Sequence, residues 1–490
     1  MNATVKGLIA CGVGLALLGG GFLALKLTSS KDADDQQSSA APEELILWHE
    51  EADTISSMEI TAGGETYSIV PSDVVTQDDA GNDVKNYKLK GYDDLPMNLT
   101  MIRTPANNAA VMEIQKIVEE NPEDLEKYGL SKPKGKAVVS FENGNKHTLL
   151  VGDETPTSGF SYCMADDKKT VYTVSTMQVT PYIQAPTYYV DTTIEAALPD
   201  GDKTVIESVR IQRKDLDYDI AFAYDEFYAS QESGGTSASH IMTEPITCNV
   251  NPVDSKNATH GLFGLAATSA FVLHPTEAQL AEAGLSDPFC TVTVKTDDGK
   301  TRVLKLGNTY KSEDGSSTYY FGYYEGTDII YGFGKDSVCW ATLQPMDIAS
   351  TLLVVTYVWD VGKLTVEADG HETMRFAGRG SNKDDYQVTL NGTDTSSERY
   401  RKFYSFLLQT AAEEILIPEQ TPTGKSLAKV TLERQDGKKT QTVEFLEAEG
   451  KKVFIVVDGH CAFKCRRGFV DTLLENMDRY KTDQDFLTTW

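Results

Sequence analysis

One short segment resembles the end of a nucleotide-binding loop, but the residues around it argue against nucleotide binding. The segment "PTGKS", residues 422–426, resembles the end of a phosphate-binding loop. Such a loop needs a glycine five residues before Gly424, where this chain has Glu419. The residues that follow alternate like a strand, whereas a phosphate loop opens a helix whose N-terminus holds the phosphate. We therefore expect no nucleotide to bind here.

An acidic stretch half-matches a calcium-binding loop. Asp215, Asp217, Asp219 and Glu226 stand where such a loop has ligands. The sixth position of the loop requires glycine for its sharp turn, and here it is Ile220. Alternation around this stretch indicates a hairpin strand preceded by an acidic turn, so we do not expect a calcium site.

The cysteines and histidines show no pattern that indicates a metal or a redox site. Cys461 and Cys465 are separated by three residues, which is neither a zinc pair nor a redox C-x-x-C. The six cysteines that follow residue 45 are too sparse for a disulfide scaffold, so we expect buried thiols, with a Cys461–Cys465 bridge as the alternative. The seven histidines lack ligand spacing, and no G-x-S-x-G is present. The sequence therefore predicts no catalytic residue, no metal site and no cofactor, and we do not expect an enzyme.

Length and charge limit the classes of protein and partner. At 490 residues the chain is long enough for about three domains, at roughly 150 residues each. Its formal net charge of −28 makes it repel phosphate backbones, which argues against nucleic acid as a partner.

The N-terminus indicates a membrane anchor. Residues 7–25 form an uncharged run of nineteen residues, long enough as a helix to cross a bilayer. No small-x-small cleavage site follows closely, so we expect an uncleaved signal-anchor rather than a signal peptide. We predict a cytoplasmic tail at 1–6, a transmembrane helix at 7–27, and a flexible acidic linker at 28–44. The body would then lie outside the cell membrane.

A ten-residue phrase occurs twice in the body. "DLEKYGLSKP" at residues 124–133 returns as "QLAEAGLSDP" at residues 279–288. The phrase reads as the end of a short helix, in which the glycine takes a left-handed conformation, the leucine packs behind it and the proline stops the helix. The repeat residues are Gly129, Leu130 and Pro133 in the first copy and Gly284, Leu285 and Pro288 in the second.

The two copies continue in register. Residues 136–153 align without a gap on residues 291–308, and both segments alternate apolar and polar residues as half-buried strands do. Gly144 and Gly299 follow Asn or Asp in pairs typical of hairpin turns, and Gly152 and Gly307 also match. Two further strands and a helical segment follow in each copy.

A third, fainter copy begins near residue 427 and lacks the repeated phrase. Two strands and a helix precede each four-strand block, and we predict these helices at 106–119, 261–271 and 397–416. Antiparallel hairpins with segregated helices indicate an α+β fold. We predict three repeated modules at 45–200, 201–356 and 357–490, the last of them divergent.

These features resemble a known family. The anchor, the acidic tether, "DLEKYGLSKP" and "LLVGDETP" are similar to the bacterial extracytoplasmic family catalogued as domain of unknown function 4340. The resemblance implies a membrane-tethered auxiliary component of an ABC-type export system. It implies no catalytic residues, because none are defined for the family.

One strand is unusually rich in tyrosine. In "STYYFGYYEG", alternation places Tyr320 and Tyr324 on one face and Tyr319 and Tyr323 on the other. One face would pack in the module, and the other is our candidate interaction surface for a glycan or peptide. The alternative is that neighbouring parts cover both faces.

Together these observations favour a membrane-anchored, extracytoplasmic, non-catalytic scaffold that docks on a transporter permease or another envelope protein. One alternative is a solute- or ion-binding accessory protein, which would have an enclosed pocket. A second is an extracytoplasmic hydrolase with a site assembled from distant residues.

Overall fold

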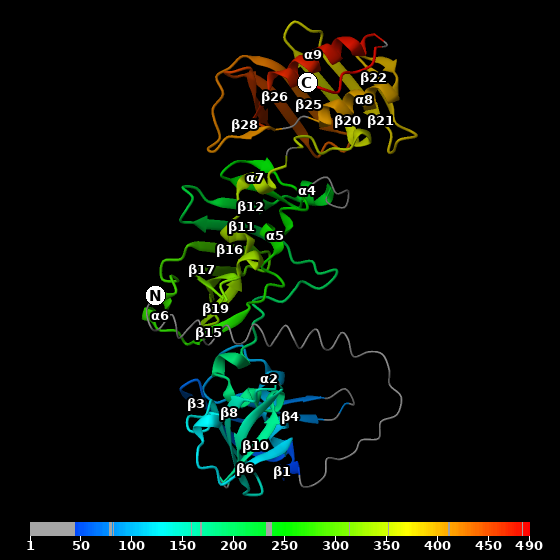
Figure 1. Ribbon diagram of the computed structural model, residues 1–490. Coiled ribbons are helices and arrows are strands. Elements are labelled where there is room, and N and C mark those ends of the chain that lie inside the picture. Colours follow the sequence, from blue (N-terminus) through cyan, green and yellow to red (C-terminus); the bar gives the residue numbers. More distant parts are fainter. Residues whose placement is uncertain are drawn as a thin grey trace. The chain divides into compact units, whose positions relative to one another are not determined.

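The computed structural model describes residues 45–490 apart from 78–80, 82, 158, 167–168, 232–237, 313, 351, 410–411 and 483 (Figure 1). The tail, anchor and linker predicted for residues 1–44 lie outside the described residues. Among the residues that are described, no helix is long and apolar enough to span a membrane.

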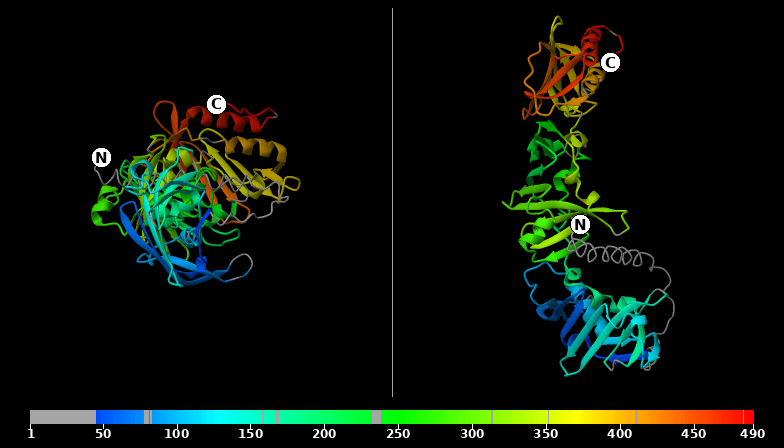
Figure 2. Two further views of the ribbon diagram at one scale, coloured as in Figure 1. Left: turned by 60° about the horizontal axis from the view of Figure 1, so that its bottom comes forward. Right: turned by 60° about the vertical axis from the view of Figure 1, so that its left-hand side comes forward.

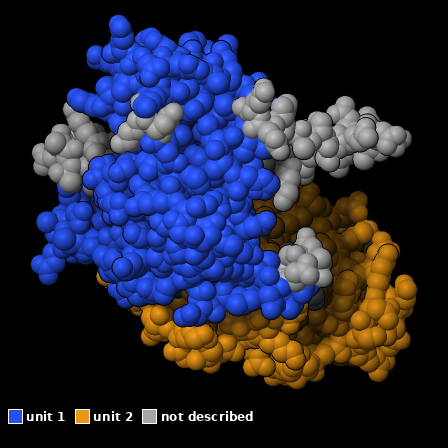
Figure 3. All heavy atoms as spheres, turned by 90° about the horizontal axis from the view of Figure 1, so that it is seen from below, with its two compact units in different colours: residues 1–194, 266–287, 306–337 blue, residues 195–265, 288–305, 338–490 orange. Residues whose placement is uncertain are grey.

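The described chain forms two compact units (Figure 3). Of the described residues, unit 1 comprises those within 45–194, 266–287 and 306–337, and unit 2 comprises those within 195–265, 288–305 and 338–490. The boundary between residues 305 and 306 falls within strand β17 (Thr301–Lys311).

The first large sheet has eight strands in the order β4-β3-β2-β7-β8-β9-β10-β6. Its strands are β2 (Ile55–Ala62), β3 (Glu65–Gln77), β4 (Asp83–Leu89), β6 (Lys116–Glu120), β7 (Gly135–Phe141), β8 (Lys146–Glu154), β9 (Phe160–Met164) and β10 (Thr170–Ser175). A separate two-stranded sheet pairs β1 (Ile46–His49) with β5 (Val111–Glu113).

The second large sheet has nine strands in the order β14-β13-β12-β11-β16-β17-β18-β19-β15. Besides β17, its strands are β11 (Ile206–Arg213), β12 (Ile220–Tyr224), β13 (His240–Glu244), β14 (Cys248–Asn249), β15 (Ser269–Leu273), β16 (Cys290–Thr296), β18 (Thr318–Tyr324) and β19 (Ile329–Gly334).

The third large sheet also has nine strands, in the order β23-β22-β21-β20-β25-β26-β27-β28-β24. They are β20 (Val361–Ala368), β21 (Met374–Arg379), β22 (Gln387–Leu390), β23 (Thr393–Thr395), β24 (Glu414–Ile415), β25 (Ser426–Arg434), β26 (Thr440–Glu447), β27 (Lys452–Val457) and β28 (His460–Arg466).

The three sheets share one strand order. In each, the leading strands run outward from the middle in one direction, and four hairpin-linked strands run outward in the other. The strand that lies between these groups in sequence closes the far edge, as β6, β15 and β24 do beside β10, β19 and β28. Every pair whose register is described is antiparallel, which confirms the predicted α+β class and the repetition of the sheet.

The helices are short beside these sheets. They are α2 (Leu99–Ala110), α3 (Thr176–Val179), α4 (Glu226–Gln231), α5 (Lys256–His260), α6 (Glu277–Glu282), α7 (Pro345–Ile348), α8 (Ser397–Leu408) and α9 (Arg467–Tyr480). Short 3-10 helices include η2 (Ala52–Thr54), η3 (Glu126–Tyr128), η4 (Thr180–Ile183), η5 (Pro186–Tyr189), η7 (Lys335–Ser337), η8 (Cys339–Ala341) and η9 (Val358–Asp360).

The helices predicted at 106–119, 261–271 and 397–416 differ from those in the structure, because the predicted ranges begin too late or extend too far. The helices are α2, α5 and α8, and strands β6, β15 and β24 lie in or just after the predicted ranges. The physical reason is that the closing strand draws its residues from this segment. Its pairing with the edge of the sheet satisfies backbone groups that local helix propensity alone would assign to a helix.

In the third sheet, α8 and α9 cover one face (Figures 1 and 2). Alternate residues of the strands, such as Leu364 and Phe445, are buried on that side. The ring centroids of Phe376 and Phe403 are 5.9 Å apart, and those of Phe445 and Phe469 are 5.5 Å apart. Aromatic contacts between helices and sheet therefore form much of this core.

Candidate functional site

The repeated phrase ends a helical turn in both copies. Gly129 follows η3 with φ 68°, and Gly284 follows α6 with φ 73°. The amide of Leu130 donates to the carbonyl of Leu125 at 3.0 Å, and Leu285 donates to Leu280 at 2.8 Å. These six-to-one hydrogen bonds, with a left-handed glycine before each leucine, are those of a Schellman motif.

The third matched glycine of each copy, Gly152 or Gly307, lies directly against this turn. A Cβ atom on Gly152 would stand 2.2 Å from the carbonyl oxygen of Tyr128, and one on Gly307 would stand 2.1 Å from that of Ala283. In the second copy, the Asn308 side-chain amide also donates to the carbonyl of Glu282 at 2.9 Å. The repeat residues therefore allow the turn that ends the helix to pack closely against the end of the second hairpin strand.

The remaining repeat residues occupy turns and strand entries. Gly144 and Gly299 have φ 91° and 79° and no atom within 4 Å of a Cβ built on them, so they serve only the backbone of the hairpin turn. Pro133 lies two residues before β7 and Pro288 two residues before β16. These residues shape turns and strand entries, and none of them carries a side chain that could bind a metal or react.

The four candidate tyrosines lie on β18. Tyr320 and Tyr324 are buried, and Tyr319 and Tyr323 are half-buried and pack against a cluster that includes Phe271 and Tyr310. The rings of Tyr310 and Tyr319 are stacked, with centroids 5.2 Å apart. The surface that these tyrosines present is therefore small, and their role in binding stays a prediction.

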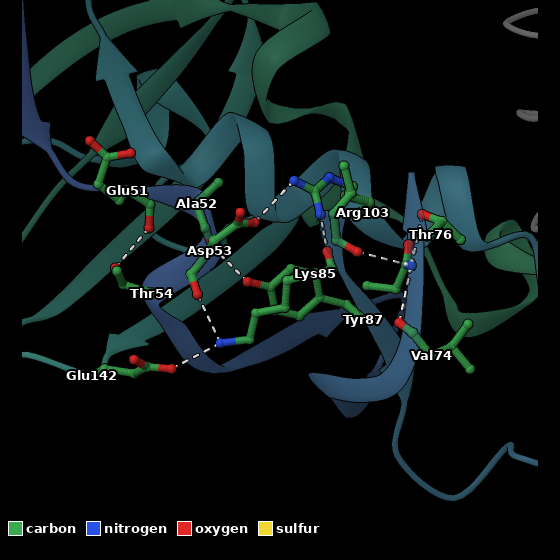
Figure 4. Close-up of polar contacts among 12 residues, drawn as sticks. Glu51, Ala52, Asp53, Thr54, Val74, Thr76, Lys85, Tyr87, Arg103 and Glu142 are labelled. Atoms are coloured by element: carbon green, nitrogen blue, oxygen red, sulfur yellow. Dashed lines mark hydrogen bonds and ion pairs between the residues drawn. The ribbon is translucent and has the colours of Figure 1, made fainter. Parts of the chain in front are cut away.

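Unit 1 contains a cluster of charged side chains where η2, β4 and α2 meet (Figure 4). Lys85 Nζ donates to Glu142 Oε1 at 2.9 Å and to the carbonyl of Asp53 at 2.8 Å. Arg103 Nη2 donates to Asp53 Oδ1 at 3.0 Å, and its Nη1 donates to the carbonyl of Lys85. Each charge in the cluster thus has a partner within it, which makes the cluster a structural joint.

The neighbouring polar side chains on β4 are used in the same way. The Tyr87 hydroxyl donates to the carbonyl of Ala52 at 2.5 Å, and burial raises the pKa of Tyr87 to about 12 (Figure 4). The Asn86 amide donates to the carbonyl of Val74 at 3.1 Å and to Thr76 Oγ1 at 3.0 Å. A neutral phenol tied to a backbone carbonyl is not positioned as an acid or a base.

His147 lies between two carboxylates in unit 1. Its Nδ1 is 2.8 Å from Asp166 Oδ2 and its Nε2 is 3.4 Å from Glu50 Oε1. Its ring stacks on Trp48 with centroids 4.6 Å apart. Glu50 also accepts hydrogen bonds from Asn145 at 2.6 Å and from Asn143 at 2.9 Å. The cluster fastens the chain after β1 to the β7–β8 hairpin.

The pKa of Glu50 gives this cluster a pH dependence. The hydrogen bond from Asn145, followed by those from Asn143 and His147, holds that pKa below 4.5. A depressed folded-state pKa means that the carboxylate stabilises the fold above pH 4.5 and that this contribution is lost as the pH falls through the folded value. We expect Glu50→Gln to unfold at lower urea than wild type at pH 7, and the difference to shrink as the pH falls below 4.5. An unchanged difference over that range would contradict the assignment.

Unit 2 has a cavity of about 140 Å³ whose walls come from five separated segments of the chain. It is lined by Asp225, Tyr228, Ile241, Thr247, Cys248, Asn249, Leu353, Lys439, Val457, Asp458, His460 and Phe463. Lys439 Nζ donates to the Tyr228 hydroxyl at 2.8 Å and lies 4.1 Å from the centroid of that ring. Glu419 Oε2 is 3.1 Å from His460 Nδ1, and its Oε1 accepts from the amide of Thr247 at 2.5 Å.

A cysteine, a histidine and a carboxylate thus surround this cavity, but their arrangement does not activate the thiol. Burial, with the Glu419 carboxylate adding to it, raises the pKa of Cys248 to about 12. Nucleophilic cysteines need the opposite shift, produced by a neighbouring imidazole or a cation. In the part of the chain that the structure describes, no hydrogen bond joins the Cys248 thiol to His460. The raised pKa keeps the Cys248 thiol protonated near neutral pH, which does not favour thiolate chemistry in this cavity.

The cysteines of the body are all free thiols among the described residues. Cys461 and Cys465 lie four residues apart on β28, which places their Cα atoms about 13 Å apart, too far for a disulfide bond. Burial raises the pKa of Cys290 and Cys465 to about 12 and that of Cys339 to about 11.

We therefore expect slow alkylation of Cys248, Cys290 and Cys465 by iodoacetamide at pH 8 in the folded protein, and rapid alkylation in 8 M urea, because only the exposed thiolate reacts. Peptide mass spectrometry would give the extent at each cysteine. Fast alkylation of Cys248 before unfolding would show that the cavity thiol is activated.

In the segments that resembled binding motifs, charged side chains form ion pairs with other residues of the chain. Asp215 accepts from Arg213, Asp219 accepts from Arg210 at 2.6 Å, and Lys425 pairs with Asp369. No group of three or more potential metal ligands occurs among the described residues.

Sequence reasoning did not find the unit 2 cavity. Glu419 is 172 residues from Thr247 and 41 residues from His460, so no local spacing joins them. The only available signal was the expectation that an enclosed pocket would accompany a solute-binding role.

The comparisons with known proteins agree with the resemblance seen in the sequence. Residues 88–254, which run from β4 to the lead strands of the second sheet and include the first copy of the repeated phrase, match a family model described as Domain of unknown function (DUF4340). No curated protein and no solved structure matches the chain. Residues 88–254 are thus similar to the family described as Domain of unknown function (DUF4340).

Proposed function

We propose that this protein is a membrane-anchored, extracytoplasmic scaffold that binds other proteins and performs no catalysis of its own. The observation that carries the proposal is the threefold use of one strand order, β4-to-β6, β14-to-β15 and β23-to-β24. Repetition of one architectural unit offers several similar surfaces for docking, whereas a single reaction centre needs no repetition.

The use of the polar side chains supports the same proposal. The Lys85–Arg103 cluster, the His147 cluster and the Glu419–His460 pair each join separate elements of their own unit. In unit 2, Lys439 also joins the β25–β26 hairpin to α4 through Tyr228. Groups that would otherwise be candidates for acid–base chemistry thus fasten the fold.

The proposal extends to location and partner. The uncharged run at residues 7–25 would anchor the chain, and the linker at 28–44 would hold the three modules, 45–200, 201–356 and 357–490, outside the membrane. A protein so placed would serve as an auxiliary component of an ABC-type transport or cell-envelope system, through contact with the permease or another envelope protein.

The experiment is crosslinking of the intact protein in its native membrane, followed by affinity capture and mass spectrometry. The expected result is an ABC-transporter permease or another integral envelope protein among the crosslinked partners. The matched control is the chain without residues 1–27, which should lose the partner because it is no longer held at the membrane. Recovery of only soluble cytoplasmic proteins would reject the proposal.

A further inference from the structure

Unit 2 has a second, larger recess, which we call the α8 cleft. It has a volume of about 310 Å³ and lies between the segment 352–359 and one side of α8. Its lining residues are Leu352, Val354, Val355, Thr356, Tyr357, Val358, Trp359, Arg401, Tyr404, Ser405 and Leu408. The volume falls in the range of small-molecule sites, about 300–1,000 Å³.

The walls of the α8 cleft are mainly apolar. Val354 and Val355 are buried, while Leu352 keeps 46% of its surface exposed. The rings of Tyr357 and Trp359 are stacked, with centroids 5.4 Å apart and planes 6° apart. An apolar side chain that remains half exposed beside an aromatic pair is a surface that an apolar ligand would cover favourably.

One charged group reaches this apolar cleft, and it is a cation. Among the described residues, Arg401 has no carboxylate in ion-pair contact, and its one hydrogen bond is a long one of 3.5 Å to the carbonyl of Lys383. Glu398, one turn earlier on α8, is in ion-pair contact with Lys402 at 3.0 Å and interacts with Arg401 only through space, without a hydrogen bond. Arg399, two residues before Arg401, differs because its guanidinium donates hydrogen bonds to backbone carbonyls, including that of Gln484 at 2.8 Å.

We propose that the α8 cleft binds a single-chain amphipathic carboxylate, with its apolar body against Leu352 and Trp359 and its carboxylate on Arg401. A guanidinium matches a planar carboxylate with two parallel hydrogen bonds. A cavity of about 150 Å³ accepts benzene, so a cleft about twice that size takes an alkyl chain of roughly eight carbons. This ligand class goes beyond the scaffold proposal and is independent of it.

The test is calorimetric titration of the full chain, held in amphipol without free detergent, with octanoate, octanol and octylamine. Octanoate is expected to bind at one site and octylamine to show no binding. Arg401→Gln should weaken octanoate at least tenfold and leave octanol nearly unchanged, because a charge-assisted pair is lost. Arg379→Gln makes the same chemical change on β21, outside the cleft, and should leave octanoate binding unchanged.

A second variant tests the apolar wall. Leu352→Asp changes a half-exposed side chain, so the fold should tolerate it, and it should abolish the binding of both octanoate and octanol. Equal affinities for octanoate and octanol, or no effect of Arg401→Gln, would overturn the carboxylate assignment. No binding of any of the three compounds would overturn the site itself. Neither result would affect partner capture, which tests the scaffold separately.

Discussion

Replacing Gly152 by alanine is expected to lower the free energy of unfolding by about 3 kcal/mol. The added Cβ would stand 2.2 Å from the carbonyl oxygen of Tyr128 and 3.0 Å from Leu130 Cγ. A backbone carbonyl cannot rotate away, so the Schellman turn and strand β8 must separate. Gly307→Ala should cost a similar amount, since its Cβ meets the carbonyl of Ala283 at 2.1 Å. Urea unfolding followed by circular dichroism measures both effects.

The matched control is Gly334→Ala, also in unit 1. Its Cβ would have only Ser337 Oγ nearby, at an ordinary 3.8 Å, and its φ is not in the left-handed region. We expect a change within about 0.5 kcal/mol for this variant. Hydrogen–deuterium exchange should show faster exchange in β7 and β8 for Gly152→Ala. If Gly152→Ala and Gly334→Ala were equally stable, the close packing of the turn on β8 would be refuted.

Replacing Phe403 by alanine is expected to lower the stability of unit 2 by about 3–5 kcal/mol. Phe403 is fully buried on α8, and its ring lies 5.9 Å from Phe376 on the sheet and 5.6 Å from Tyr480 on α9. Its removal leaves a cavity where the two helices and the sheet meet. Differential scanning calorimetry and urea titration both measure the loss.

Ser405→Ala provides the control on the same helix, because Ser405 is exposed and alanine is a good helix former. This change should leave the transition within about 0.5 kcal/mol of wild type. The same small effect for Phe403→Ala would mean that α8 does not pack on the third sheet as described.

The hairpins could be predicted from the sequence because their signals are local. The strands β7 to β10 and β16 to β19 follow alternation and turn pairs that occur within a few residues of one another. The helix stop at Gly129 is also a local signal, and the structure has it. Local chemistry determined these elements, and tertiary packing did not override it.

The closing strands could not be predicted in the same way. The segment 116–120 becomes β6 because it pairs with β10 about fifty residues later, and helix propensity in the window around it gives no sign of that partner. The cavity with Cys248 and the α8 cleft are likewise non-local. Arg401 resembles any exposed helical arginine in sequence, and only the packing of residues 352–359 against α8 gives it an apolar setting.

The closing strands also bear on how such a chain avoids misfolding. Three sheets with one strand order in a single polypeptide invite exchange, because a closing strand from one sheet could pair at the open edge of another. The three closing strands have different chemistry: "KIVEE" in β6, "SAFVL" in β15 and only "EI" in β24. A swapped pairing would set charged residues where an apolar strand belongs, or leave an edge half covered. The differences in sequence among the three closing strands therefore favour the pairing of each closing strand with its own sheet.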